Sequence, residues 1–349
     1  MYKPNSPWTW AFVAVSVVQA AIVLGFEAFA FAKFQSSLRG DTNKESPSHT
    51  IPTFLALYIF GFLYQLLLVY DALRLKNTIQ IIGLCIYNVG LLVYAAVQMD
   101  QIDEAIEQLS SKDLIDASVW NQEKPFLIAI PCVIGLVTVL MAVIAWKLYD
   151  EFAWTIYKHI SADLKMKRRY LTFQIYIALL KFDFFFFLGF TIQFVVVVVD
   201  RSNVEFYLTI AAIPITIIIL IMAGFFTRRE NTPGMLVIIT LYFAGLAYFL
   251  FKLARMWQPN GPRYSLYNPV RSPLTTFAVI TVILIVLTII NACMCTANFG
   301  HGLKPHITGR KLESEEEKFA NHNMTEMPNY NYGYGPGPGG AVGTRMTID

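Results

Sequence analysis

The sequence predicts an all-α fold, a polytopic transmembrane helical bundle of about eight spans with a disordered C-terminal tail. Three observations predict it. Of the 349 residues, 56% are hydrophobic and only 15% are charged, whereas about a quarter of a typical soluble domain is charged. The hydrophobic residues lie in long runs, so the apolar excess must face lipid rather than water. In lipid, a helix satisfies its own backbone hydrogen bonds, which an open strand edge cannot do.

About 20 mostly apolar residues cross the roughly 30 Å hydrocarbon core as a helix. In the first half of the chain, four stretches meet this requirement: residues 8–32, 51–70, 78–97 and 125–146. The first is too long for the core of a signal peptide and lacks a clear small-residue cleavage site, which predicts a retained span. Between the third and fourth spans, Ile102, Ile106 and Leu109 recur at helical spacing in an acidic loop. This spacing predicts a short amphipathic helix on the membrane surface.

The second half of the chain holds four more such stretches: residues 171–199, 204–226, 233–251 and 273–296. The fifth span is the longest, and as a helix it would reach about 43 Å. That length predicts either a tilt or a helix that extends beyond the hydrocarbon. Residues 150–169, which precede it, predict either such an extension or an interfacial helix.

The composition of the chain changes after the last predicted span. We therefore divide the sequence into a multi-pass transmembrane domain, residues 1–299, and a tail, residues 300–349. The tail is polar, becomes acidic at residues 313–317 and finishes with NYNYGYGPGPGG. Such a composition cannot build a hydrophobic core, and it predicts disorder.

The basic residues predict the orientation. Of the 27 Lys and Arg residues, 16 fall in connections on the side of the N-terminus, 10 fall on the opposite side, and Lys181 lies within a span. Basic residues are enriched on the cytosolic side of membrane proteins. This bias predicts that both termini lie in the cytosol.

Two opposite charges, Lys181 and Asp183, lie well inside the fifth span. A charge near the bilayer centre costs about 2.5–3.5 kcal/mol, so each needs a partner or water. Two positions apart on a helix, they point to different sides and cannot readily pair with each other. Glu27 of the first span is the candidate partner for Lys181. Two interpretations stay open. One is an ion- or proton-coupled site. The other is structural: the charges lock neighbouring helices together, or Lys181 extends to the cytosolic interface.

A basic run, KMKRRY, lies immediately before the fifth span. Its four cations, Lys165, Lys167, Arg168 and Arg169, are candidates for binding anionic lipid headgroups, at about 1 kcal/mol each. The alternative is an ordinary basic flank that fixes the topology of the span.

Two cysteines, Cys293 and Cys295, occur where the last span meets the predicted cytosolic side. This position is suited to S-palmitoylation. The other two cysteines of the chain lie in or beside apolar runs and are expected to behave as small hydrophobic residues.

The sequence lacks the signatures of membrane enzymes. All five histidines lie outside the predicted spans, and no Gly-rich phosphate loop or Ser-His-Asp order is visible. Asp71 and Asp183 could suggest an intramembrane aspartyl protease, but no Gly-x-Gly-Asp accompanies the second aspartate. The net charge of +3 is too small to indicate a nucleic-acid partner. We therefore expect no enzymatic chemistry, no cofactor, no metal ion and no nucleic acid.

The segment MKRRYLTFQIYIALLKFDFFFFLGF, residues 166–190, resembles the hallmark segment of an uncharacterised fungal family of multi-pass Golgi apparatus membrane proteins. The rest of the chain resembles that family through the layout of its spans and its polar tail. The resemblance implies a location in the Golgi membrane. It implies no activity, cofactor or catalytic residue.

Two functions are compatible with these features. The first is a non-enzymatic membrane scaffold or trafficking component, embedded in the lipid bilayer, whose tail recruits cytosolic protein partners. The alternative is a small-solute or ion-coupled transporter in which Glu27, Lys181 and Asp183 line a polar cavity.

Overall fold

Helices account for nearly all of the chain that the computed structural model describes, which comprises residues 6–37, 46–111, 114–116, 118–159, 164–198, 204–258 and 271–301. Within these ranges no strand is found, so the predicted all-α class is confirmed. The described helices all belong to one unit, Met1–Lys304. The predicted tail lies outside the described residues beyond His301.

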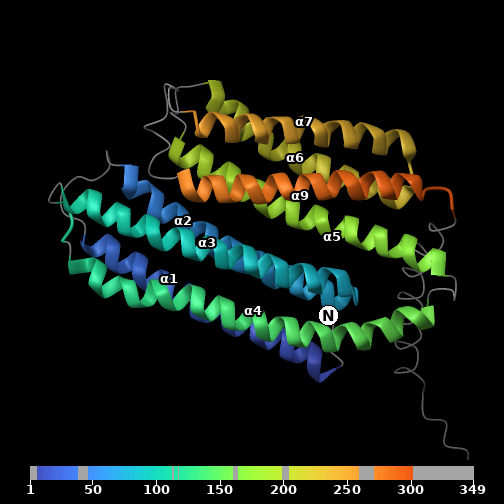
Figure 1. Ribbon diagram of the computed structural model, residues 1–349, viewed down its shortest axis with the longest axis horizontal. Coiled ribbons are helices and arrows are strands. Elements are labelled where there is room, and N and C mark those ends of the chain that lie inside the picture. The colour runs from blue at the N-terminus through green and yellow to red at the C-terminus, as the bar shows by residue number, and fades with distance from the viewer. Residues whose placement is uncertain are drawn as a thin grey trace, which may run out of the picture. The chain divides into compact units, whose positions relative to one another are not determined.

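The bounds of the helices follow the predicted spans (Figure 1). The elements are α1 (Pro7–Ser37), α2 (Ser46–Arg74), α3 (Thr78–Ser110), α4 (Ser118–His159), α5 (Leu164–Gln193), α6 (Val204–Arg229), α7 (Thr232–Met256) and α9 (Arg271–Ala297), and a π-helical turn, η1 (Phe194–Val198), continues α5. Eight of the described helices are long and apolar enough to cross a membrane. Seven of the predicted spans each fall within one helix, and the fifth falls within α5 and η1 apart from Val199, which lies outside the described residues.

The predicted surface helix between the third and fourth spans is wrong. Ile102, Ile106 and Leu109 continue α3 without a break, and at most 3% of each residue is exposed. They belong to the same hydrophobic cluster as Val119 and Leu127 of α4. The physical reason is that the apolar stripe of this segment is buried in one hydrophobic cluster with apolar side chains from the first turns of α4, rather than against lipid headgroups.

The segment before the fifth span extends two helices. α4 continues to His159 and α5 begins at Leu164, so the structure shows the helical extension rather than a separate interfacial helix. Residues 160–163 lie outside the described residues.

Two short connections have the same local design. In each, a residue with positive φ, Lys76 (φ 48°) or Glu230 (φ 53°), is followed by an asparagine that caps the next helix. Asn77 accepts hydrogen bonds from backbone N–H groups at the start of α3, and Asn231 does the same at the start of α7. Such caps satisfy donors that the first helical turn leaves unpaired. The result is two tight hairpins, α2–α3 and α6–α7.

The α5 helix is shared by two hydrophobic clusters. One cluster contains Phe185 and Phe186 of α5 together with residues of α1–α4, α7 and α9. The other contains Tyr176 and Leu180 of α5 together with residues of α6, α7 and α9. Because α5 supplies side chains to both clusters, it lies between the α2–α3 hairpin on one side and α6 and α9 on the other.

A close approach of helices occurs at Gly189 of α5. A Cβ atom at this position would lie 2.6 Å from Cε1 of Phe277 on α9 and 3.3 Å from Cδ1 of Leu57 on α2. Glycine is therefore required here by space, because any side chain would overlap the Phe277 ring.

Candidate functional site

Lys181 of α5 is bound to both helices of the α2–α3 hairpin. Its Nζ donates to Oδ2 of Asp71 at 2.5 Å and to Oε1 of Gln80 at 2.7 Å. Gln80 in turn donates through Nε2 to Oδ2 of Asp71 at 3.1 Å. In addition, the Tyr64 hydroxyl donates to the carbonyl oxygen of Lys181 at 2.7 Å. The side chains of Lys181 and Asp71 are 24% and 34% exposed, so this ion pair lies at a partly open end of the hairpin.

The expected pairing of Lys181 with Glu27 is wrong. Glu27 is 3% exposed and accepts a hydrogen bond from Nε2 of Gln98 at 3.1 Å. Gln98 lies eighteen positions after Gln80 on the same helix, which is about 27 Å along its axis. Glu27 therefore lies far along α3 from Lys181, and its partner is an amide rather than a cation.

Asp183 faces a different neighbour. Its carboxylate is buried, with 5% of the residue exposed, and its Oδ2 accepts a hydrogen bond from the Thr288 hydroxyl of α9 at 2.6 Å. Its other oxygen, Oδ1, has no hydrogen-bond partner among the described residues. The two charges of α5 thus have separate partners, as their spacing predicts. Asp71 and Asp183 contact different groups and do not form a catalytic pair.

Sequence reasoning missed a network of uncharged side chains that joins α1, α2, α3 and α4. Oδ1 of Asn88 accepts hydrogen bonds from Nε2 of Gln19 at 2.8 Å and from Nε2 of Gln65 at 3.3 Å. Nδ2 of Asn88 donates to the Thr138 hydroxyl at 2.8 Å. Gln19, Gln65 and Asn88 are at most 1% exposed. The available signal was the presence of amides inside predicted spans, because a polar group in lipid needs a partner on a neighbouring helix.

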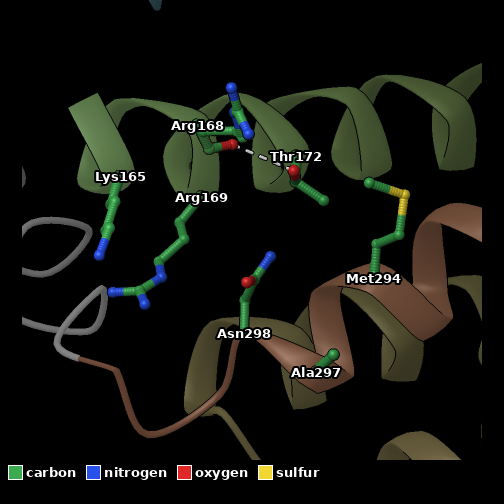
Figure 2. A pocket seen from close by; sticks show the side chains of 7 residues that line it. All are labelled: Lys165, Arg168, Arg169, Thr172, Met294, Ala297 and Asn298. Carbon is green, nitrogen blue, oxygen red and sulfur yellow. Dashed lines mark hydrogen bonds between the residues drawn. The ribbon is translucent and has the colours of Figure 1, made fainter.

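Most of the predicted lipid-binding cations line a pocket where α5 begins and α9 ends (Figure 2). The cavity has a volume of about 560 Å³, and its lining consists of Lys165, Arg168, Arg169, Thr172, Met294, Ala297 and Asn298. Lys167 is described but does not line it. Figure 2 shows Lys165 and Arg169 extending from α5 toward the side from which Asn298 approaches. Nη1 of Arg169 also donates to the carbonyl oxygen of His301 at 3.1 Å.

Comparison with known proteins identifies the family. The chain is 33% identical over 316 residues to a UPF0658 Golgi apparatus membrane protein of Schizosaccharomyces pombe, and the match covers 84% of this chain and 88% of the relative. The chain belongs to the UPF0658 family. The resemblance inferred from residues 166–190 is thereby confirmed. No family model and no solved structure matches the chain.

The two candidate acylation sites of this UPF0658 member differ in accessibility. Cys293 is exposed, whereas Cys295 is 4% exposed and its Sγ lies 3.7 Å from the carbonyl oxygen of Thr172 on α5. Of the two thiols, that of Cys293 is therefore the more accessible to an acyl donor. Both cysteines remain predictions as palmitoylation sites.

The polar residues of the UPF0658 fold therefore fall into separate groups rather than one site. Lys181, Asp183, Glu27 and the Asn88 network each join neighbouring helices at a different place, and the basic pocket lies at the helix ends. Within the described part of the chain, no group of three or more His, Cys, Asp or Glu side chains is placed to hold a metal ion.

Proposed function

We propose that this UPF0658 protein is a non-enzymatic scaffold or trafficking component of the Golgi membrane. The observation that supports it most is that each charge inside the fifth span is bonded to a neighbouring helix, Lys181 to Asp71 and Gln80 and Asp183 to Thr288. The name of the S. pombe relative supports the Golgi location. The bias of basic residues supports cytosolic termini.

The packing around α5 favours a static bundle over a moving carrier. A carrier alternates between two arrangements of its helices about a central site. Here Lys181 holds both helices of the α2–α3 hairpin, and the Phe185 ring packs on Tyr64 and Tyr87 of the same hairpin with centroid distances of 5.9 and 4.8 Å. Movement of α5 against the hairpin would break the ion pair and these aromatic contacts together, which supports a structural role for the charges.

Exchanging the charges of Lys181 and Asp71 tests this structural role. Lys181→Asp alone places two carboxylates together and should lower the free energy of unfolding by about 1 kcal/mol, a modest cost because the pair is partly exposed. Combining it with Asp71→Lys restores an attractive pair. We expect the double variant to recover most of the lost stability and the Golgi residence, measured as Tm in detergent and by fluorescence microscopy.

The scaffold and the transporter predict different outcomes for these charge variants. A purely structural pair predicts that the double variant is functional. If instead it folds and resides in the Golgi but the cell still shows the phenotype of the deletion strain, the structural role is contradicted. Thr288→Val, which removes the donor to Asp183 at a buried site, provides a comparison at the other charge of α5.

The segment after His301 is proposed to recruit the cytosolic partners of the scaffold. Ending the chain after residue 301 should leave the eight spans folded and should remove most of the proteins captured by proximity labelling from the full-length chain. A version in which the four glutamates within residues 313–317 are neutralised serves as the matched control for charge. Capture of an unchanged set of proteins by the truncated chain would contradict a scaffold that acts through its tail.

A transporter is the second candidate, and one observation favours it. Oδ1 of Asp183 is buried without a partner among the described residues, and an unpaired carboxylate oxygen within a span is a feature of ion-coupled sites. Under this alternative, Asp183→Asn would abolish solute uptake into reconstituted vesicles while leaving folding and Golgi residence unchanged.

A further inference from the structure

We propose that the pocket between the start of α5 and the end of α9 binds the phosphorylated headgroup of a phosphoinositide from the adjoining leaflet. Three of its lining residues, Lys165, Arg168 and Arg169, are cationic, and none of the seven described lining residues is acidic. This proposal does not depend on the scaffold function, because a carrier could hold the same lipid.

The chemistry of the pocket suits phosphate. All three cations lie in the first two turns of α5, and Lys165 and Arg169 extend toward Asn298 whereas Arg168 extends to the other side of the helix (Figure 2). The dipole at the start of a helix also favours an anion. The guanidinium group of arginine binds phosphate oxygens with two parallel hydrogen bonds. The Thr172 hydroxyl and the Asn298 amide add uncharged hydrogen-bonding groups to the lining (Figure 2). Glu230 does not line the pocket, and its carboxylate accepts a hydrogen bond from the backbone N–H of Gly300.

The size of the pocket indicates more than a single phosphate group. A cavity of about 560 Å³ falls within the range of pockets for small organic ligands, roughly 300–1,000 Å³. Two cations, Lys165 and Arg169, extend into this region (Figure 2), and two exceed what a phosphodiester with a single negative charge requires. An inositol ring with a phosphomonoester fits the volume and supplies the further negative charge.

The position of the pocket indicates a lipid rather than a soluble anion. The candidate span Lys165–Val196 begins at the pocket and the candidate span Arg271–Ala297 ends there, and basic residues next to a span are expected at the depth of lipid headgroups. Met294 lines the pocket and is 51% exposed, and Figure 2 shows it on α9, on the side of Thr172 away from Lys165. An acyl chain can therefore run along the apolar surface of α9 while the headgroup occupies the basic end.

Binding of a fluorescent short-chain phosphatidylinositol 4-phosphate to the full-length protein in detergent tests the proposal. The pocket variant Lys165→Ala/Arg169→Ala should weaken binding at least tenfold, because both side chains line the pocket and a basic side chain beside an anionic headgroup contributes about fivefold. The control variant Lys167→Ala/Arg228→Ala removes the same charge from residues that do not line the pocket, and it should weaken binding less than twofold. The melting temperatures of both variants must match that of the unchanged protein. If the pocket variant is unstable, Arg169→Lys, which keeps the charge, replaces it in the binding measurement.

Two competitors distinguish the source of the phosphate. Soluble inositol phosphate that displaces the probe as effectively as the unlabelled lipid would overturn the assignment to a lipid. Phosphatidylserine that competes equally would overturn the assignment to a phosphorylated ring, because it would show a response to charge alone. An equal loss of binding in the pocket and control variants, or no binding at all, would also overturn the proposal.

Discussion

Replacing Gly189 with valine should destabilise the bundle by about 3 kcal/mol, as expected for overpacking of a well-filled core. The new Cβ would lie 2.6 and 3.1 Å from two atoms of the Phe277 ring. That ring cannot move aside freely, because it is 2% exposed and packs against Tyr94 and Phe186 with centroid distances of 5.1 and 5.8 Å. The measurement is Tm of the purified protein in detergent.

Gly245→Val is the matched control for this substitution. Gly245 lies inside α7, and a Cβ there meets nothing within 4 Å. Both variants exchange a helical glycine for the same β-branched residue, so their difference isolates the overlap with Phe277. Equal melting temperatures for the two variants would show that α5 and α9 do not approach as closely as described.

Replacing Asn88 with leucine should lower the free energy of unfolding by about 2–3 kcal/mol. The substitution keeps the branching and the number of heavy atoms of the side chain but removes the acceptor shared by Gln19 and Gln65 and the donor to Thr138. Hydrogen bonds between helices in membranes contribute roughly 0.6–1.7 kcal/mol each, and several are lost together here. Asn121→Leu, at an exposed position in the first turn of α4, should change the unfolding free energy by less than about 0.5 kcal/mol.

A double-mutant cycle checks that these amides act as one network. Once Asn88 is leucine, Gln19 has lost its acceptor, so Gln19→Leu should then cost little or should even restore stability. The two single effects are therefore expected to exceed the effect of the pair by at least about 0.5 kcal/mol. Strict additivity would mean that Gln19 and Asn88 contribute independently, which would contradict the network.

The spans were predictable because lipid restricts the options of the backbone so severely. Long apolar runs in the sequence must form helices, and the eight predicted stretches, apart from Val199, lie within the helices described. The helix ends were less predictable, as Ile102, Ile106 and Leu109 show. Their spacing marked a helix correctly, but only the fold shows that this helix continues α3 and buries these residues together with Val119 and Leu127 of α4.

The partners of the polar residues could not be obtained from the sequence. Spacing along α5 showed that Lys181 and Asp183 face different sides, yet it held no information on which helices flank α5. Glu27 was chosen because it is charged, whereas the structure satisfies Lys181 with Asp71, which lies at a span edge, and with the uncharged Gln80. The basic pocket combines a run near residue 165 with residues more than a hundred positions later, so only the fold brings them together.

The tight turn at Lys76 and Asn77 has a consequence for biosynthesis. Because the turn and its cap are local, α2 and α3 can enter the bilayer from the translocon as a preformed pair while the later helices are still being made. Asp71 and Gln80 therefore precede Lys181 both along the chain and in the membrane. When Lys181 of α5 enters the membrane, both acceptors of its ammonium group are already in position. The hydrogen bonds to them then offset the free energy of inserting the charge during assembly rather than after it.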